Sequence, residues 1–307
     1  MAKRARTSRR TAPRPMPPTI TELVRHTASR LRAAKLVFAH GTTDPRVEAA
    51  FLVGEALQLP PHRFNPSSRT RVSAAARAAV DELVEARVRT RKPAAYLVHK
   101  AYLQGVPFYV DERVIVPRSF LAEILAGDLF GDDGLIDPTR VTRVLDLCTG
   151  SGCLAILAAL RFADATVDAV DVSQDALDVA AVNVADHGLK DRVRLLRGDL
   201  FAPLGDARYD LIITNPPYVD APGMAGLPPE CRHEPPLAFD GGADGIVLVR
   251  RIVDAARRHL DDRGGLLCEV GRGRAAGEGA FARAHFLWLD TEESEGEVFW
   301  IDAKDLP

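Results

Sequence analysis

From about residue 141 onward, short apolar runs alternate with amphipathic segments, and this alternation constrains the fold more than any other feature of the chain. Apolar runs separated by helical patterns are typical of a parallel sheet covered by helices on both faces. The expected strands are 144–147, 166–170, 193–196, 211–213 and 266–270, followed by an antiparallel hairpin at 286–289 and 298–301. We therefore predict an α/β fold, a doubly wound Rossmann-like sheet that is mostly parallel.

Helical patterns precede this region. They begin near Thr21, at Asp44-Pro45 and near Ser73, and the Asp-Pro pair is a typical N-cap followed by proline at the first helical position. An aromatic and β-branched stretch then predicts a β-hairpin linker. The helical part carries no recognisable chemistry, so we expect it to recognise the substrate. The expected boundaries are 1–18 for a basic tail, 19–92 for the helical domain, 93–118 for the hairpin and 119–307 for the α/β domain.

A glycine-rich loop follows the first expected strand and reads Asp146-Leu-Cys-Thr-Gly-Ser-Gly-Cys153. Its two glycines let the backbone turn tightly and approach a ligand at the N-terminus of the following helix. Asp171 ends the next strand, where such folds hold a carboxylate against ribose hydroxyls. A glycine loop with this acid also fits an NAD-dependent dehydrogenase. Asp146 favours S-adenosylmethionine instead, because an acid at this place organises a methionine amino group.

The fourth expected strand ends abruptly in Asn215-Pro216-Pro217-Tyr218. Two consecutive prolines have fixed φ angles and no N–H, so they end the strand in a rigid turn. The turn offers the side-chain oxygen of Asn215 and the carbonyl of Pro216 as acceptors. We interpret it as a receptor for an NH2 group on a flat, conjugated carrier.

With these motifs the chain resembles the class I S-adenosylmethionine-dependent methyltransferases, and within them the protein-(glutamine-N5) methyltransferase family. The resemblance is to the branch that acts on large-subunit ribosomal protein L-three, on the basis of three stretches. These are Gly105-Val-Pro-Phe-Tyr-Val-Asp-Glu-Arg-Val-Ile-Val-Pro-Arg-Ser119, the glycine loop, and Met224-Ala-Gly-Leu-Pro-Pro-Glu-Cys-Arg-His-Glu-Pro235. The chain departs from the family pattern at Phe120, Cys231 and Val247, which puts fine specificity in question more than chemistry.

The resemblance implies methyl transfer from S-adenosylmethionine to a glutamine side-chain amide, without a metal. The residues expected to bind the cofactor are Asp146, Cys148, Thr149, Gly150, Ser151, Gly152, Asp171, Val172, Asp199, Leu200 and Asn215. The expected catalytic residues are Asn215, Pro216, Pro217 and Tyr218, and the expected substrate contacts are Asn215, Pro216, Tyr218 and Arg118. The expected partner is ribosomal protein L-three or an assembling ribosomal particle.

Three alternatives stay open at this point. The same reaction on peptide-chain release factors is one. A second is an N6-adenine methyltransferase, because adenine also presents an amine on a conjugated ring; the net charge of −2 and the lack of a basic, aromatic-rich recognition region argue against it. The third is a non-catalytic ribosome-assembly factor, against which the intact Asn-Pro-Pro-Tyr turn argues.

The first residues carry six basic side chains between Lys3 and Arg14 and no acid before Glu22. Two interpretations of this tail stay open: an RNA contact, or a solvated segment without a partner. No apolar run is long enough to span a membrane, and no signal-peptide core follows the basic start, so we expect a cytoplasmic protein. The four cysteines show no metal-binding spacing, so we expect no metal site.

Overall fold

The chain divides into two compact units in the computed structural model, which describes residues 16–127, 129–130, 134–282, 284–292 and 294–307. The first unit contains the described residues up to Lys35 together with Asp44–Arg89, and the second contains Leu36–Thr43 and Thr90–Pro307. The expected basic tail lies outside the described residues for most of its length. Among the described helices, none combines the length and the apolar character that a bilayer span requires.

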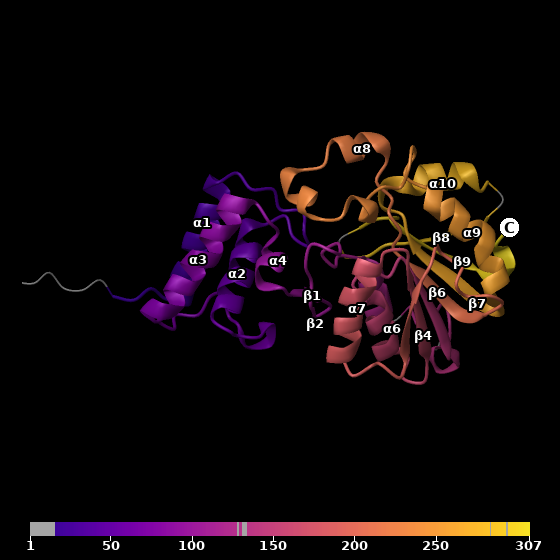
Figure 1. Cartoon of the computed structure of the whole chain (residues 1–307), viewed down its shortest axis with the longest axis horizontal. Helices are drawn as coiled ribbons and strands as arrows, with labels where there is room; N and C mark the ends of the chain where they lie inside the picture. Colours follow the sequence, from indigo (N-terminus) through magenta and orange to yellow (C-terminus); the bar gives the residue numbers. More distant parts are fainter. Residues whose placement is uncertain (1–15, 128, 131–133, 283, 293) are drawn as a thin grey trace, which may run out of the picture. The chain divides into compact units, whose positions relative to one another are not determined.

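The first unit is built from α1 (Ile20–Ala33), α2 (Pro45–Ala56) and α3 (Ala74–Thr90), with a short 3-10 turn at Pro61–Arg63 (Figure 1). Two of the expected starts are confirmed in detail. Thr19 caps α1 in a reciprocal capping box with Glu22, and Asp44 caps α2 ahead of Pro45. The apolar faces of the helices meet in a core that includes Leu23, Leu31, Leu52, Val80 and Val84.

One feature of this core was not expected from the sequence. Arg87 is fully buried, and its Nε donates to the Glu48 carboxylate at 2.8 Å. A buried ion pair costs desolvation energy on both sides, so it is stable only while both partners are present. The pair therefore makes the association of α2 with α3 dependent on two complementary charges as well as on apolar packing.

The second unit is organised around a seven-stranded sheet in the order β5-β4-β3-β6-β7-β9-β8 (Figure 1). The strands β3 to β7 are parallel, and β9 runs antiparallel to both β7 and β8. This confirms the predicted mostly parallel sheet with an antiparallel hairpin at its edge. The strands are β3 (Arg143–Leu147), β4 (Thr166–Asp171), β5 (Val193–Arg197), β6 (Tyr209–Thr214), β7 (Leu260–Glu269), β8 (Leu287–Leu289) and β9 (Val298–Asp302).

Helices cover both faces of this sheet. They include α5 (Leu121–Ala126), α6 (Cys153–Arg161), α7 (Gln174–Asp186) and α9 (Val247–His259), each of which contacts a strand. The short helices α8 (Ala221–Ala225) and α10 (Arg274–Ala280) lie in the connections after β6 and β7. Alternate residues of each strand point to opposite faces, so the sheet separates two apolar cores. On β6, Leu211 and Ile213 pack into the core that contains α5 and α6, whereas Ile212 packs into the core that contains α9. The unit also has 3-10 turns at Pro138–Arg140, Pro229–His233, Pro236–Ala238, Gly271–Gly273 and Ala303–Asp305.

The strand β7 begins at Leu260, earlier than the expected 266, and includes Gly264 and Gly265. The two glycines looked like a strand break in the sequence. A Cβ atom on Gly265 would lie 2.1 Å from the Trp300 ring, so this position stays in the strand and makes room for the indole. Packing across the sheet, which the sequence does not reveal, explains the difference.

The expected hairpin at 93–118 is also shorter than predicted. Only β1 (Ala101–Leu103) and β2 (Val106–Phe108) pair, and the preceding residues form the short helix α4 (Ala94–Val98). Tyr96 of α4 is buried and donates a hydrogen bond from its hydroxyl to the carbonyl of Val114. The aromatic residues of this stretch therefore serve packing as well as strand pairing.

Candidate functional site

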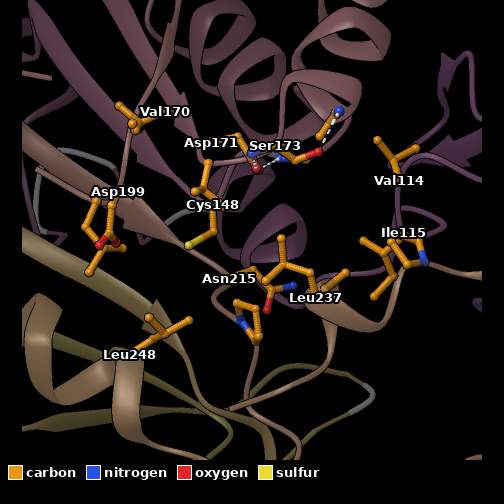
Figure 2. A pocket seen from close by; sticks show the side chains of 18 of the residues that line it. Val114, Ile115, Cys148, Val170, Asp171, Ser173, Asp199, Asn215, Leu237 and Leu248 are labelled. Carbon is orange, nitrogen blue, oxygen red and sulfur yellow. Dashed lines mark hydrogen bonds between the residues drawn. The ribbon is translucent and has the colours of Figure 1, made fainter. Parts of the chain in front are cut away.

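A cavity of about 330 Å³ lies at the carboxyl ends of β3, β4, β5 and β6 (Figure 2). Ligands of open α/β sheets bind at this edge of the sheet. The cavity wall from the sheet side consists of Cys148, Gly150, Val170, Asp171, Val172, Ser173, Gly198, Asp199, Leu200, Asn215 and Pro217. The other lining residues are Arg113, Val114, Ile115, Ala176, Pro235, Leu237, Ala238, Leu248 and Arg251. Seven of the predicted cofactor-binding residues therefore line one cavity, namely Cys148, Gly150, Asp171, Val172, Asp199, Leu200 and Asn215.

The loop after β3 turns sharply because Cys148, Gly150 and Gly152 all have positive φ angles, of 59°, 55° and 79°. Left-handed backbone is ordinary for glycine and uncommon for cysteine. The sulfur of Cys148 lies on the cavity wall (Figure 2), whereas Ser151 and Gly152 are buried behind it. The loop thus presents backbone, and only a few side chains, to the cavity.

Asp146 lies beneath this loop and is fully buried, outside the cavity lining. Its Oδ2 accepts hydrogen bonds from the Thr149 hydroxyl at 2.5 Å and from the N–H of Ala155 at 3.0 Å. Its Oδ1 is buried and has no partner among the described residues. Burial raises the pKa of Asp146 to about 7. A buried carboxyl oxygen without a partner is costly, and a cationic ligand group would offset that cost.

Asp171 is the last residue of β4 and lines the cavity directly (Figure 2). Its Oδ2 accepts from the N–H of Gly150 at 2.9 Å, and its Oδ1 accepts from the N–H of Ser173 at 2.9 Å. Burial raises the pKa of this carboxyl above its usual value, and the backbone hydrogen bonds oppose the shift. Because each carboxylate oxygen has a second lone pair, both can accept from a pair of ligand hydroxyls.

Asp199 and Leu200 come shortly after β5, and both line the cavity. The Asp199 carboxylate is about half exposed and accepts a hydrogen bond of 2.7 Å from Arg251. Leu200 has a φ angle of 52° and is buried, which turns the chain so that both residues face the cavity. An acceptor next to an apolar wall is suited to the amino edge of a purine ring.

The Asn-Pro-Pro-Tyr turn begins directly after β6. Asn215 and Pro217 line the cavity, and Pro216 is buried. The Nδ2 of Asn215 donates to the Arg118 carbonyl at 3.5 Å, a long hydrogen bond. This contact assigns the amide nitrogen to the protein, while Oδ1 accepts no hydrogen bond from the residues that the structure describes. The Asn215 side chain thus offers one acceptor to a ligand at the cavity wall.

Tyr218, the last residue of the turn, lies outside the cavity lining. Its hydroxyl donates to Oε1 of Glu269 at 2.9 Å. Burial and the Glu269 carboxyl raise the pKa of Tyr218 well above its usual value, so the hydroxyl stays protonated. Burial also raises the pKa of Glu269 to about 7, against the hydrogen bonds from Ser119 and Tyr218. Sequence reasoning missed Glu269, although an acid at the end of a buried strand was a visible signal.

Arg118, which was predicted to contact the substrate, also lies outside the cavity lining. Its guanidinium forms a two-pronged ion pair with Glu234, with distances of 2.9 and 3.0 Å, and its Cζ lies 5.6 Å from the Phe239 ring centroid. The main-chain carbonyl of Arg118, rather than its charge, contacts Asn215. The expected substrate contact through the guanidinium stays a prediction.

Glu234 also belongs to a cluster that the sequence did not suggest. Its Oε2 lies 3.1 Å from His40 Nε2, and Cys231 Sγ lies 3.9 Å from the same nitrogen. These three side chains could in principle hold a metal ion. Arg118 and the N–H of Val116 already occupy the carboxylate, however, and the guanidinium charge repels a cation. Burial tends to raise the pKa of Glu234, but His40 and Arg118 outweigh it, so the pKa lies below its usual value.

Comparisons with known proteins agree with this geometry. Residues 134–225 match the family described as Methyltransferase small domain, and residues 22–98 match the PrmC N-terminal domain. The ribosomal protein uL3 glutamine methyltransferase of Bradyrhizobium diazoefficiens is 64% identical over 94% of this chain and 92% of its own. The protein of the same name from Burkholderia pseudomallei is 50% identical over 97% of this chain and 98% of its own.

Solved structures resemble the chain more distantly. A methyltransferase from Pyrococcus furiosus matches 71% of this chain and 97% of its own, with 17% sequence identity and a TM-score of 0.48. The family assignment therefore rests on the sequence relatives, whose match extends through both units of the chain. The parallel sheet, its antiparallel edge and the Methyltransferase small domain make the fold that of a class I methyltransferase. The chain belongs to the family of ribosomal protein uL3 glutamine methyltransferases.

Proposed function

We propose that the chain transfers a methyl group from S-adenosylmethionine to the side-chain amide nitrogen, N5, of a glutamine in ribosomal protein uL3. The proposal rests on one observation above the others. Asn215 lies on the wall of the cavity with its Nδ2 held by the Arg118 carbonyl, which leaves Oδ1 available as an acceptor. An acceptor fixed in this way selects an NH2 group rather than a carbonyl. The relatives named for glutamine methylation in uL3 supply the substrate class.

The residues around the cavity fit S-adenosylmethionine group by group. The buried Oδ1 of Asp146, which has no partner among the described residues, suits the ammonium of the methionine part. Asp171 suits the two ribose hydroxyls, and Asp199 with Leu200 suits adenine. When bound, S-adenosylmethionine supplies a methyl group on a positively charged sulfonium. In this proposal Cys148 and Gly150, the glycine-loop residues that line the cavity, lie under the cofactor, while Thr149, Ser151 and Gly152 are buried and shape the loop.

The chemical difficulty lies with the acceptor amide, whose nitrogen lone pair is delocalised into its carbonyl. Asn215 Oδ1 and the Pro216 carbonyl would accept the two N–H groups and hold the nitrogen in line with the methyl group. The same two oxygens stabilise the positive charge that develops on the nitrogen during transfer. Because this stabilisation is electrostatic, the turn needs no strong general base before the transfer. The sulfur would keep the electron pair of the broken S–CH3 bond and leave as a neutral thioether, and the methylated nitrogen would lose one proton to water afterwards. The rigid Pro216-Pro217 backbone keeps the acceptors in place while the charge develops.

The substrate proposal is tested by supplying the protein with S-adenosylmethionine labelled in its methyl group. Parallel reactions contain purified ribosomal protein uL3, a purified release factor, or naked nucleic acid. We expect label in uL3 alone. Label in nucleic acid would favour adenine as the acceptor, and label in the release factor would favour the sister reaction. A protein that binds the cofactor and labels none of the three would contradict the proposal.

A further inference from the structure

Glu269, the last residue of β7, is a buried carboxylate with three hydrogen-bond donors around it. Its Oε1 accepts from the Tyr218 hydroxyl at 2.9 Å. Its Oε2 accepts from the Ser119 hydroxyl at 2.6 Å and from the N–H of Phe120 at 3.0 Å. Each of these groups is a donor in this arrangement, so the site is built for an acceptor-only side chain.

The donors belong to two segments that flank the Asn-Pro-Pro-Tyr turn. Tyr218 is the last residue of the turn, so Oε1 holds its far end. Ser119 directly follows Arg118, whose carbonyl accepts from Asn215 at the start of the turn. One carboxyl group is therefore connected to both ends of the turn. It binds the Tyr218 hydroxyl directly. It reaches Asn215 indirectly, because it binds Ser119, and the preceding carbonyl of Arg118 accepts from Asn215.

The Tyr218 ring is held in place by packing as well as by its hydroxyl. A Cβ atom built on Gly271 would lie 2.6 Å from Cε2 of the ring, so the ring packs against a bare Cα. Gly271 has a φ angle of 50°, which few other residues adopt. The ring contacts Gly271, two residues beyond Glu269 in the chain, and the hydroxyl contacts Glu269 itself. Tyr218 thus occupies a slot that the end of β7 provides.

We infer that Glu269 is a positioning residue for methyl transfer, which fixes both ends of the Asn-Pro-Pro-Tyr turn and thereby aims Asn215 Oδ1 at the substrate amide. This inference rests on the proposed function. It assigns Tyr218 the role of an anchor, because its hydroxyl is committed to Glu269 and the residue lies outside the cavity lining. Glu269 itself touches neither the cavity nor the reacting groups.

The carboxylate matters because glutamine in its place would present an NH2 group to one of the donors. With the amide oxygen toward Ser119 and Phe120, the NH2 group faces Tyr218, and two donors then meet. Tyr218 must rotate its hydroxyl or shift its ring, although the side-chain volume is unchanged. Glu269→Gln therefore disturbs the alignment of the turn while it keeps the packing around it.

The experiment measures kcat and KM for methylation of ribosomal protein uL3 by Glu269→Gln and Tyr218→Phe. We expect kcat to fall roughly tenfold or more in each variant, because misplacing a positioned acceptor affects the transition state. The KM for uL3 and the calorimetric dissociation constant for S-adenosylmethionine should change less than about twofold. Because both variants act on one contact, the double variant should be no slower than the slower single variant.

The chain offers a matched control on the same sheet. Tyr209 begins β6, and its buried hydroxyl donates to Asp168 at 2.7 Å, so it repeats the tyrosine–carboxylate contact at the opposite end of the strand from the turn. Tyr209→Phe should keep kcat within about twofold of the unmodified protein. An equal loss of kcat in Tyr209→Phe and Tyr218→Phe would mean that both act through general stability.

Two results would overturn the inference. One is unchanged kcat in Glu269→Gln and Tyr218→Phe, and the other is the equal loss in the control. A failure of the proposed function is a separate outcome, because the unmodified protein would then not methylate uL3 at all. A variant that no longer binds S-adenosylmethionine has lost the fold, and Tyr218→Phe, which removes a single oxygen atom, then decides the question alone.

Discussion

Asp146 combines complete burial with one carboxyl oxygen that has no partner among the described residues. Leaving an acceptor in this state costs free energy, which evolution tolerates mainly where a ligand completes the hydrogen bonding. Burial and, to a smaller extent, the charge of Asp171 raise its pKa to about 7, against the hydrogen bonds from Thr149 and Ala155. In the absence of a ligand the group is therefore partly protonated near neutral pH.

This raised pKa predicts that binding at the proposed cofactor site depends on pH. In that proposal the ionised Asp146 binds the ammonium of S-adenosylmethionine, so binding at pH 6 requires that the carboxyl first lose its proton. We expect affinity to increase as the pH rises from 6 through about 7. It should fall again at higher pH, once the ammonium of the cofactor loses its proton near the usual α-amino pKa of about 8. Calorimetry at several pH values, in buffers with different ionisation enthalpies, would detect the proton released on binding.

Asp146→Asn is the control for that measurement, because it keeps the shape and cannot ionise. Its affinity should be lower and should depend less on pH between 6 and 8. Equal pH dependence in the variant and in the unmodified protein would remove Asp146 from the cofactor site. Asp171, whose pKa is also raised, would then be the alternative source of the effect.

At the level of helices and strands, the apolar runs predicted every strand of the large sheet, because strands buried on both faces have little choice of residue. The cap at Asp44 likewise predicted where α2 begins. The early start of β7 was not predictable, because it depends on the fit of Trp300 over Gly265. Contacts made by loop residues were not predictable for a related reason. No local sequence pattern shows that Glu234 contacts both Arg118 and His40.

In the candidate site, too, some features could be predicted from the sequence and others could not. Asp171, Asn215 and the glycine loop could be found because they follow strands at the ligand-binding edge of the sheet. Their exact roles depend on contacts between distant segments, such as the Arg118 carbonyl that orients Asn215. The contact of Tyr218 with Glu269 joins residues 51 positions apart, and nothing in the turn itself predicts it.

The helix pair α2 and α3 gives a prediction about stability. Arg87→Ala removes the partner of the buried Glu48 and leaves an uncompensated charge in the core of the first unit. We expect the free energy of unfolding to fall by about 3–5 kcal/mol, as for other buried ion pairs that lose one partner. Urea unfolding followed by circular dichroism measures the change.

Arg77→Ala on the same helix is the matched control. The Arg77 side chain is more than half exposed, and its Nε lies 3.5 Å from Oδ2 of Asp81. Exposed pairs contribute little, so the change should stay within about 1 kcal/mol. A similar loss of unfolding free energy in the two variants would show that burial does not determine how much the Arg87 ion pair contributes to stability.

For the molecule as a whole, the two units differ in the site residues that they hold. The second unit holds the cavity, the turn and every residue proposed to act on the cofactor or the amide. The first unit matches the PrmC N-terminal domain over most of its length, and none of its described residues lines that cavity. We propose that the helical unit recognises the ribosomal substrate while the second unit carries out the transfer.

The central claim is that Asn215 directs methyl transfer to a glutamine amide of ribosomal protein uL3. Mass spectrometry of purified uL3 after incubation with S-adenosylmethionine and either the unmodified protein or Asn215→Ala tests it most directly. The account predicts a single methyl increment on one glutamine side chain with the unmodified protein. With Asn215→Ala it predicts a rate at least about a hundredfold lower at an unchanged cofactor affinity. Methylation of another residue type, or full activity of Asn215→Ala, would contradict the account.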